Sequence, residues 1–261
     1  MNPDSSFFDI RIANTETDLL AAQRLRYRVF IEELGGDGPM VDHEARLERD
    51  EFDPIVDHLV LVDMRRDPAE LDHVVGVYRL LPGDRAAEYG RFYCDSEYDL
   101  SKLKASGRSL LELGRSCVLP DYRGGIGMLL MWSALSEYVL GRNIDILFGV
   151  ASFHGLDVEA LAQSLGWLHF NHLAPESVRP VALPAGYQRM DLIAESDLDR
   201  RAAMTGMPAL IKAYLRLGGT VGEGAFLDRE FNTTDVLLLM DTGAMSQKHR
   251  DYYTARWQTK G

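Results

Sequence analysis

Carboxylates and guanidinium groups recur at close spacing in the first half of the chain, and these groups could hold an amino acid and deprotonate it. Three acidic residues stand in the short run Glu48, Asp50 and Asp53. Two nearby carboxylates suit a cationic side chain, because an ammonium group needs an opposite charge. Arg26 and Arg79 are candidates for fixing an α-carboxylate in two-pronged contacts, for which Arg is better suited than Lys. The alternative for each is to order a loop or a solvated surface.

Glu112 is a candidate general base, because it stands in the apolar segment 110–119 and a partly buried carboxylate can have a raised pKa. The alternative is an ion pair of Glu112 with Arg115 or Arg79 that only orders the segment. His154, which we expect directly after a strand, is a second candidate base. Its alternative is a structural hydrogen-bonding role, so the sequence leaves the identity of the base open.

A glycine-rich turn follows the apolar segment. Arg123 is followed by Gly124, Gly125, Ile126 and Gly127, and then by an apolar run that predicts a helix. Glycines let backbone N–H groups approach a ligand closely, and a helix N-terminus favours anionic oxygens. The pattern predicts a cradle for a pyrophosphate or a phosphopantetheine, although tight packing of a strand on a helix also uses glycine without any ligand.

Composition restricts the class of protein. The chain has 261 residues, 46% of them hydrophobic and 26% charged, and a net charge of −12. This composition is ordinary for a folded protein with a substantial core. The acidic balance argues against a nucleic-acid binder. Apolar stretches are too short to span a bilayer and the N-terminus lacks the features of a signal peptide, so we expect a cytoplasmic protein.

Two cysteines and two histidines are candidate reactive or metal-binding groups. Cys94 and Cys117 do not make a disulfide framework, and Cys117 suits a small buried core residue better than an acyl-accepting nucleophile. His169 and His172 have a spacing that could bind a metal on a helix. A third ligand is not evident and the pattern there does not predict a helix, so we expect no metal site.

The elements that must position these residues follow from periodicity and from turn signals. A capping box at Thr15 and Asp18 predicts the start of the first helix, which Gly35 ends. The predicted strands are 7–13, 58–62, 74–81, 110–119, 144–150, 189–193, 225–227 and 236–240. The predicted helices are 15–34, 128–140, 158–165, 198–204 and 208–217. With no linker or repeat, residues 1–261 predict a single mixed α/β domain with inserted loops.

The strand, the turn Arg123–Gly127 and the helix together resemble the acyl-CoA-binding core of the GCN5-related N-acyltransferase superfamily. The usual form is Arg/Gln-x-x-Gly-x-Gly/Ala, and this turn is one residue shorter, which leaves room for a donor carried by a protein. The resemblance implies a mixed central sheet with splayed central strands and flanking helices, with the donor's phosphopantetheine between those strands. The donor-binding residues that it implies are Cys117, Val118, Arg123, Gly124, Gly125 and Gly127.

Narrower resemblances extend along the chain. Segment 25–30, the acidic triplet, Arg79 and segment 112–115 are similar to motifs of the acyl-homoserine-lactone synthases. Segments 148–157, 172–175, 211–218 and 231–236 resemble the bacterial L-ornithine N(α)-acyltransferases of ornithine-lipid synthesis. The likeness implies transfer of a long, 3-hydroxylated acyl chain to the α-amino group of ornithine, giving lyso-ornithine lipid. The acceptor-binding residues that it implies are Arg26, Asp50, Asp53, Arg79 and Arg115.

The same resemblance implies the partners. The donor would be the acyl-phosphopantetheine of acyl carrier protein, with no further cofactor. A lipid product implies a transient contact with the membrane, so the enzyme is expected in the cytoplasm or at the periphery of the inner membrane. Alternatives are glutamine or another amino acid as acceptor, a homoserine-lactone synthase that uses S-adenosylmethionine, and a non-catalytic acyl-carrier-protein binder on the same scaffold.

Overall fold

Strand β5 (Leu110–Val118) is the central strand that the sequence predicted, and the chain around it forms two units. The computed structural model describes residues 6–123 and 125–243. Of the described residues, unit 1 comprises 6–85 and Leu113–Asn143, and unit 2 comprises Ala86–Glu112 and 144–243. Strand β5 therefore contributes its first three residues to unit 2 and the others to unit 1. That the units act as a single N-acyltransferase domain stays a prediction.

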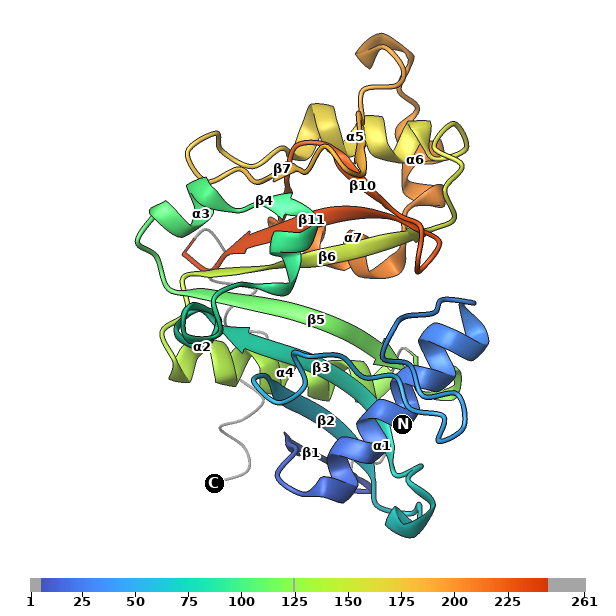
Figure 1. Ribbon diagram of the computed structural model, residues 1–261. Coiled ribbons are helices and arrows are strands. Elements are labelled where there is room, and N and C mark those ends of the chain that lie inside the picture. The colour runs from blue at the N-terminus through green and yellow to red at the C-terminus, as the bar shows by residue number, and fades with distance from the viewer. Residues whose placement is uncertain (1–5, 124, 244–261) are drawn as a thin grey trace. The chain divides into compact units, whose positions relative to one another are not determined.

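Unit 1 is a sheet with helices on its two faces (Figure 1). The strand order is β1-β2-β3-β5, and both β1 with β2 and β2 with β3 are antiparallel. Its elements are β1 (Phe8–Ile12), α1 (Glu16–Arg26), the π-helix η1 (Tyr27–Glu33), β2 (Asp57–Asp63), the 3₁₀ helix η2 (Pro68–Glu70), β3 (Val74–Pro82), the start of α2 (Gly83–Tyr89), the 3₁₀ helix η4 (Pro120–Tyr122) and α4 (Gly125–Gly141).

Helix α1 begins where the sequence predicted. The Thr15 hydroxyl accepts a hydrogen bond from the Asp18 backbone N–H at 3.1 Å, which satisfies one of the free N–H groups of the first turn. The helix then continues without a break into η1, whose wider turns the periodicity did not predict. Gly35, with φ +74, ends this segment as expected, since glycine adopts positive φ without strain.

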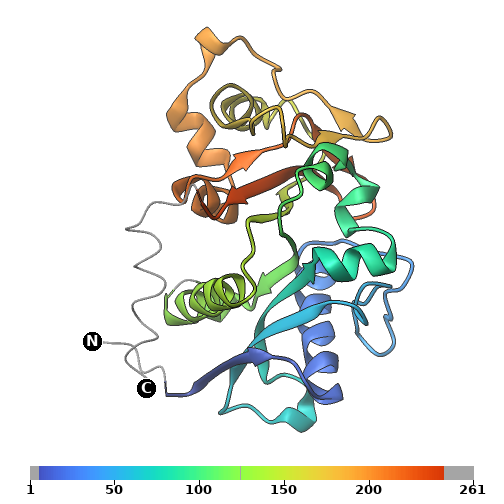
Figure 2. The ribbon, with the colours of Figure 1, turned by 90° about the vertical axis from the view of Figure 1, so that its left-hand side faces the viewer.

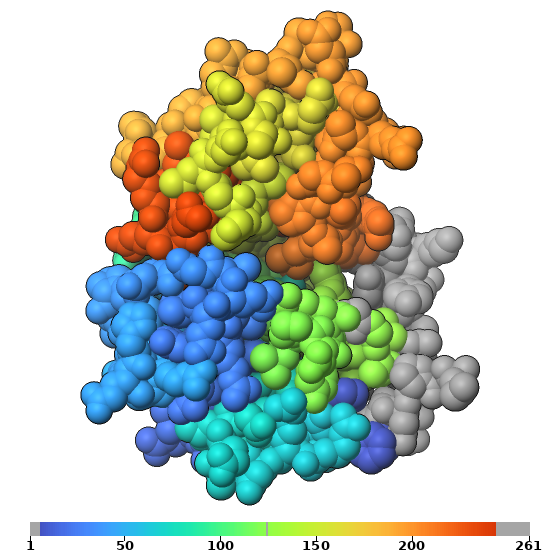
Figure 3. Space-filling view, turned by 90° about the vertical axis from the view of Figure 1, so that its right-hand side faces the viewer, coloured from blue at the N-terminus to red at the C-terminus, as the bar shows by residue number. Residues whose placement is uncertain are grey.

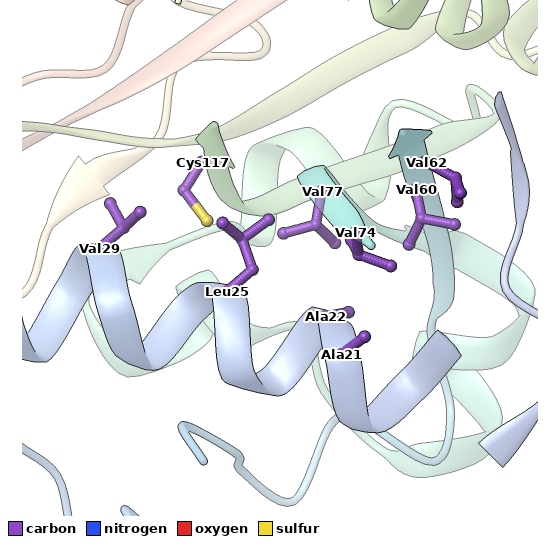
Figure 4. Packing of buried hydrophobic residues seen from close by; sticks show 9 residues of the cluster. All are labelled: Ala21, Ala22, Leu25, Val29, Val60, Val62, Val74, Val77 and Cys117. Atoms are coloured by element: carbon purple, nitrogen blue, oxygen red, sulfur yellow. The ribbon is translucent and has the colours of Figure 1, made fainter. Parts of the chain in front are cut away.

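Helices α1 and α4 cover opposite faces of the unit 1 sheet (Figure 2). Successive strand residues point to opposite faces, so alternate residues meet different helices. Figure 4 shows one face, where Leu25 of α1 and Val29 of η1 pack with Val60, Val77 and Cys117. On the other face, a Cβ at Gly76 would lie 2.7 Å from the sulfur of Met131 of α4. The absence of a side chain at position 76 therefore lets α4 approach the sheet closely.

Unit 2 holds the parallel part of the mixed sheet. Strands β5 and β6 are parallel, and their ladder has three pairs, from Leu110↔Ile146 to Glu112↔Phe148. The strand order is β5-β6-β11-β10-β8, β9 also pairs with β11, and β4 pairs with β7. The elements are η3 (Tyr93–Ser96), β4 (Tyr98–Asp99), α3 (Ser101–Ala105), β6 (Ile146–His154), α5 (Ala162–His172), β7 (Val181–Ala182), β8 (Tyr187–Gln188), η5 (Glu195–Asp197), α6 (Arg200–Gly206), α7 (Ala209–Arg216), β9 (Thr220–Val221), β10 (Ala225–Asp228) and β11 (Thr233–Asp241).

Two predictions around His154 are wrong. The strand does not end at residue 150, because β6 pairs with β11 over nine positions and this ladder keeps His154 within the strand. The next helix is α5, Ala162–His172, and not 158–165. Asp157 accepts a hydrogen bond from the Ala160 N–H at 3.2 Å, which forms a local turn in place of a helix start. His169 and His172 consequently lie on the last turn of a helix, contrary to the prediction.

The predicted strand 189–193 is also wrong. Only Tyr187 and Gln188 pair with β10, as strand β8. The Arg189 guanidinium then donates to both the carboxylate and the backbone carbonyl of Asp191, two residues along the chain. Side-chain contacts within such a short span compete with a ladder. Across the described ranges 6–123 and 125–243, no helix combines the length and the apolar character needed to cross a bilayer.

The packing of α1 generates a stability prediction. Leu25 is 1% exposed and lies in the core of unit 1, so Leu25→Ala should lower the free energy of unfolding by about 2–5 kcal/mol. Leu140→Ala is the matched control, because Leu140 lies in α4 and is 55% exposed. It should change stability by less than about 0.5 kcal/mol. Urea unfolding followed by circular dichroism would measure both, and equal losses would contradict the packing described.

Candidate active site

Six charged side chains from four parts of unit 1 come together in a network. Arg26 ends α1, three carboxylates come from the loop before β2, Arg79 lies on β3 and Arg115 on β5. The members are Arg26, Glu48, Asp50, Asp53, Arg79 and Arg115. The structure therefore brings together all five residues predicted to bind the acceptor, and it adds Glu48. We call this group the charged network.

Arg26 is the buried centre of the charged network. Its side chain is 0% exposed. Its Nε donates to Glu48 Oε2 at 2.5 Å, its Nη1 and Nη2 donate to the two oxygens of Asp53 at 2.7 Å each, and Nη2 also donates to the Glu48 carbonyl at 2.6 Å. Burial lowers the pKa of Arg26, but the charges of Glu48 and Asp53 outweigh it and raise that pKa above its ordinary value. The guanidinium thus fixes the acidic loop on the end of α1.

Asp53 joins Arg26 to β3 and β2. Besides Arg26, its oxygens accept from Gln23 Nε2 at 2.9 Å and from Arg79 Nη1 at 3.2 Å, while its backbone carbonyl contacts His58 Nε2 at 3.1 Å. Burial raises the pKa of Asp53, but the adjacent guanidinium of Arg26 outweighs it and holds the pKa far below the usual range. Asp53 therefore remains ionised at neutral pH, and its low pKa makes it a weak proton acceptor.

Asp50 and Arg115 are the members of the charged network that solvent reaches. Asp50 is 18% and Arg115 13% exposed, against at most 5% for the other four. Arg79 Nη1 donates to Asp50 Oδ1 at 2.5 Å, and Arg115 Nη2 to Asp50 Oδ2 at 3.3 Å. Arg115 Nε also donates to Glu48 at 3.0 Å. A small polar molecule could therefore meet one negative and one positive group while the buried ion pairs stay intact.

Arg115 has an unusual backbone conformation. Its φ is +47, although it stands inside strand β5 and carries a side chain. The left-handed conformation costs roughly 1–2 kcal/mol for a residue other than glycine. The two hydrogen bonds from its guanidinium to Glu48 and Asp50 hold the side chain in place. Such outliers persist where the surroundings determine the conformation, and they cluster at functional sites.

Glu112 is buried and accepts two backbone hydrogen bonds. Its Oε2 accepts from the Tyr93 N–H at 2.8 Å and its Oε1 from the Cys94 N–H at 2.7 Å. The carboxylate therefore anchors the start of η3 to the central strand. This contact is an ordering role of the kind that the sequence left open, and it is made to the backbone N–H groups of Tyr93 and Cys94.

The two candidate bases are not brought together. Glu112 pairs with Phe148 in the β5–β6 ladder, and His154 stands six residues further along β6 with an exposed side chain. Six residues of extended strand span about 20 Å. Glu112 and His154 therefore cannot both contact one reacting atom, and a mechanism must choose between them.

The predicted donor-binding residues lie at the end of β5 and the start of α4. Arg123 Nε donates to the Val118 carbonyl at 2.9 Å, and its two terminal nitrogens each donate to Glu33 at 2.6 Å. Gly125 has φ +65, and a Cβ at Gly127 would lie 2.9 Å from Leu61. Glycine at 127 thus serves close packing of α4 on the sheet. Gly124, also predicted here, lies outside the described residues.

Cys117 is a core residue, as its small apolar character suggested. It packs in the cluster between α1 and the unit 1 sheet. Burial raises the pKa of its thiol well above the ordinary value, so the thiol stays protonated. This geometry does not support a nucleophile at position 117.

Sequence reading missed the roles of Glu33, Glu48 and Gln23. Glu48 belonged to the acidic triplet, so its place was signalled by spacing, but its burial against Arg26 was not. Glu33 bonds Arg123 from 90 residues away. No sequence pattern near Glu33 could predict Arg123 as its partner, because the contact depends on how the start of α4 is placed beside the end of η1.

The charged network generates a prediction about stability. Asp53→Asn would leave Arg26 buried with one neutralising carboxylate fewer, so we expect a loss of about 3–5 kcal/mol in the free energy of unfolding. Asp42→Asn is the control, since Asp42 forms a more exposed pair with Arg49 and should change stability by at most about 1 kcal/mol. Urea unfolding at pH 7 compares them, and a small loss for Asp53→Asn would show that Arg26 does not depend on it.

The pH dependence of stability has a defined sign. The pKa values of Glu48, Asp50 and Asp53 are all lowered in the folded chain, where nearby arginines outweigh burial. Lowered carboxyl pKa values stabilise the fold above the unfolded-state pKa of about 4, and this stabilisation is lost as pH falls further. We expect the urea midpoint to fall steeply below about pH 4 and less steeply in Asp53→Asn. Identical slopes would contradict this assignment.

Comparison with known proteins agrees with this geometry. Residues 25–133, which hold the charged network and the turn before α4, match the family model described as an acetyltransferase (GNAT) domain. Among solved structures, FeeM, an N-acyl amino acid synthase from uncultured soil microbes, has a TM-score of 0.55 at 13% identity and covers 97% of this chain and 98% of its own. The CoA-dependent acyl-homoserine lactone synthase BjaI has a TM-score of 0.52 at 16% identity, covering 94% and 84%. These likenesses show the fold, a mixed sheet with flanking helices, as the sequence predicted.

Curated relatives give the family. The L-ornithine N(alpha)-acyltransferase of Rhodobacter capsulatus is 65% identical over 97% of this chain and 97% of its own. The enzyme of the same name from Brucella abortus is 40% identical over 95% of this chain and 89% of its own. The chain belongs to the L-ornithine N(alpha)-acyltransferase family.

Proposed function

We propose that this chain transfers a long, 3-hydroxylated acyl chain from acyl carrier protein to the α-amino group of L-ornithine, giving lyso-ornithine lipid. The observation that carries the proposal is the 65% identity to an L-ornithine N(alpha)-acyltransferase along 97% of both chains. The charged network supports it independently, because it offers both signs of charge that a cationic amino acid requires.

Asp50 and Arg115 are the proposed acceptor-binding pair. Ornithine carries a side-chain ammonium and an α-carboxylate, and the exposed edge of the charged network holds one carboxylate and one guanidinium next to each other. Asp50 would bind the ammonium and Arg115 the carboxylate. Arg26, Asp53 and Arg79 would act behind them as positioning residues, because their side chains are buried and bonded within the protein.

The reaction needs a neutral amine and a stabilised oxyanion. The α-ammonium loses a proton, its nitrogen attacks the thioester carbonyl carbon, the C–N bond forms and the C–S bond breaks, and the thiol of phosphopantetheine leaves with a proton. We assign the proton acceptor to Glu112, acting directly or through water. It stands at the last pair of the β5–β6 ladder, three residues before Arg115. His154, about 20 Å further along β6, is then outside the reaction centre.

A contact with the membrane accompanies a lipid product. At the open end of β1 and β2, Met64 is 57% exposed and its N–H donates to the Phe7 carbonyl. The Arg65 guanidinium lies 4.9 Å from the centre of the Phe7 ring. Because Arg65 is also paired with Asp63, the exposed apolar side chains Phe7 and Met64 are the groups that would enter the membrane boundary. We place the transient membrane contact at this tip.

The test of the proposed function is single-turnover transfer from a 3-hydroxyacyl carrier protein to labelled ornithine, with glutamine in a parallel reaction and products identified by mass spectrometry. We expect N-acylornithine only. Product with glutamine alone would keep the reaction and replace the acceptor. Absence of product in both, from folded protein and intact donor, would refute the acyltransferase assignment.

The assignment of the base is tested by two variants in the same assay. Glu112→Gln should lower kcat about 100-fold or more, because a positioned general base contributes about 10²–10⁴ in rate. His154→Gln should lower it less than about threefold, since the His154 side chain is exposed and far along β6. The reverse order of effects would move the reaction centre to the His154 end of the strand.

A further inference from the structure

Glu33 and Arg123 form a two-pronged ion pair beside the start of α4. Each terminal nitrogen of Arg123 donates to a different oxygen of Glu33, at 2.6 Å in both cases. The third donor, Nε, is held by the Val118 carbonyl at 2.9 Å. A planar guanidinium binds a carboxylate and a phosphate through the same fork of N–H groups. Glu33 therefore occupies the face of Arg123 that a phosphate would use.

The pair is accessible to a ligand. The Arg123 side chain is 44% exposed and that of Glu33 35%. In Figure 3, the blue surface of the N-terminal segments adjoins the green surface at the start of α4. The guanidinium of Arg123 lowers the pKa of Glu33, so this carboxylate is ionised at neutral pH. Because both side chains are partly exposed and a phosphate fits the same fork of N–H groups, an incoming phosphate can compete with the Glu33 carboxylate for Arg123.

The charge at this place affects different donors unequally. A phosphopantetheine on a carrier protein is joined through one phosphodiester with one negative charge. Coenzyme A carries a pyrophosphate and a further phosphate on its ribose. With Glu33 beside it, Arg123 offers no net positive charge, and the carboxylate repels a multiply charged ligand more than a singly charged one. Specificity is often set by a repulsive group of this type.

Building on the proposed donor site at Arg123, we propose that Glu33 is a donor-specificity residue that favours carrier-bound phosphopantetheine over acyl-CoA. Its neighbour Glu32 pairs with Arg46 and not with Arg123. The chain thus contains two adjacent glutamates on η1, each in an exposed ion pair, of which one faces the proposed donor site.

The experiment compares Glu33→Gln, Glu32→Gln and the wild-type chain with the same 3-hydroxyacyl group on carrier protein and on CoA. The readout is the ratio of kcat/KM for acyl-CoA to that for acyl carrier protein, because loss of a negative charge could improve binding of either donor. Glu33→Gln should raise this ratio about tenfold, and Glu32→Gln should leave it within about twofold. In an Arg123→Gln background, Glu33→Gln should shift the ratio less, since the phosphate fork is then absent.

The outcomes separate this inference from the proposed function. An active wild-type enzyme whose donor ratio is the same in Glu33→Gln overturns the role of Glu33 and leaves the acyltransferase assignment standing. A wild-type enzyme inactive with both donors overturns both. Titration calorimetry with free CoA gives a second measurement that requires no turnover. There, tighter binding to Glu33→Gln than to Glu32→Gln supports the inference, and equal binding overturns it.

Discussion

The burial of one guanidinium organises unit 1. Arg26 at the end of α1 lies wholly out of solvent, and a buried charge is tolerated only when it is paired and hydrogen-bonded. Glu48 and Asp53 supply that pairing, and through them the acidic loop is fixed against β3 and β5. Without these bonds to Arg26, the loop could not hold Asp50 in a partly exposed position beside Arg79 and Arg115. The proposed acceptor-binding pair, Asp50 and Arg115, is in this sense a consequence of pairing the buried charge of Arg26.

The same arrangement divides the network into two kinds of members. The buried arginines and carboxylates bond one another, so their charges hold the acidic loop in place and do not face a ligand. Asp50 and Arg115 keep partial exposure and complementary charge, which a zwitterionic or cationic amino acid can bridge. The strained backbone at Arg115 fits this division, because the ion pairs of its side chain help to hold a conformation that an isolated strand would not adopt.

Donor recognition depends on a different balance. The turn before α4 places Arg123 where an anion could bind, yet an acidic residue from η1 already faces it. The proposed donor is carried by a strongly acidic protein, so an acidic enzyme cannot rely on overall attraction to recruit it. If a phosphodiester replaces Glu33 as the partner of Arg123, the enzyme can recognise one phosphate without attracting multiply charged anions in general.

The sequence by itself determined the central strand, the capped first helix, the glycine-rich turn and the short acidic run that holds Glu48, Asp50 and Asp53. These features depend on local periodicity, capping chemistry and spacing, all of which are written in neighbouring residues. Only the tertiary structure decided the length of β6, the pairing of Glu33 with Arg123, the contacts of Glu112 with the start of η3, and which charges are buried. Each of these depends on contacts between residues far apart in the chain. The ladder to β11 kept His154 in a strand against its polar local pattern, because pairing over nine positions outweighs local preference.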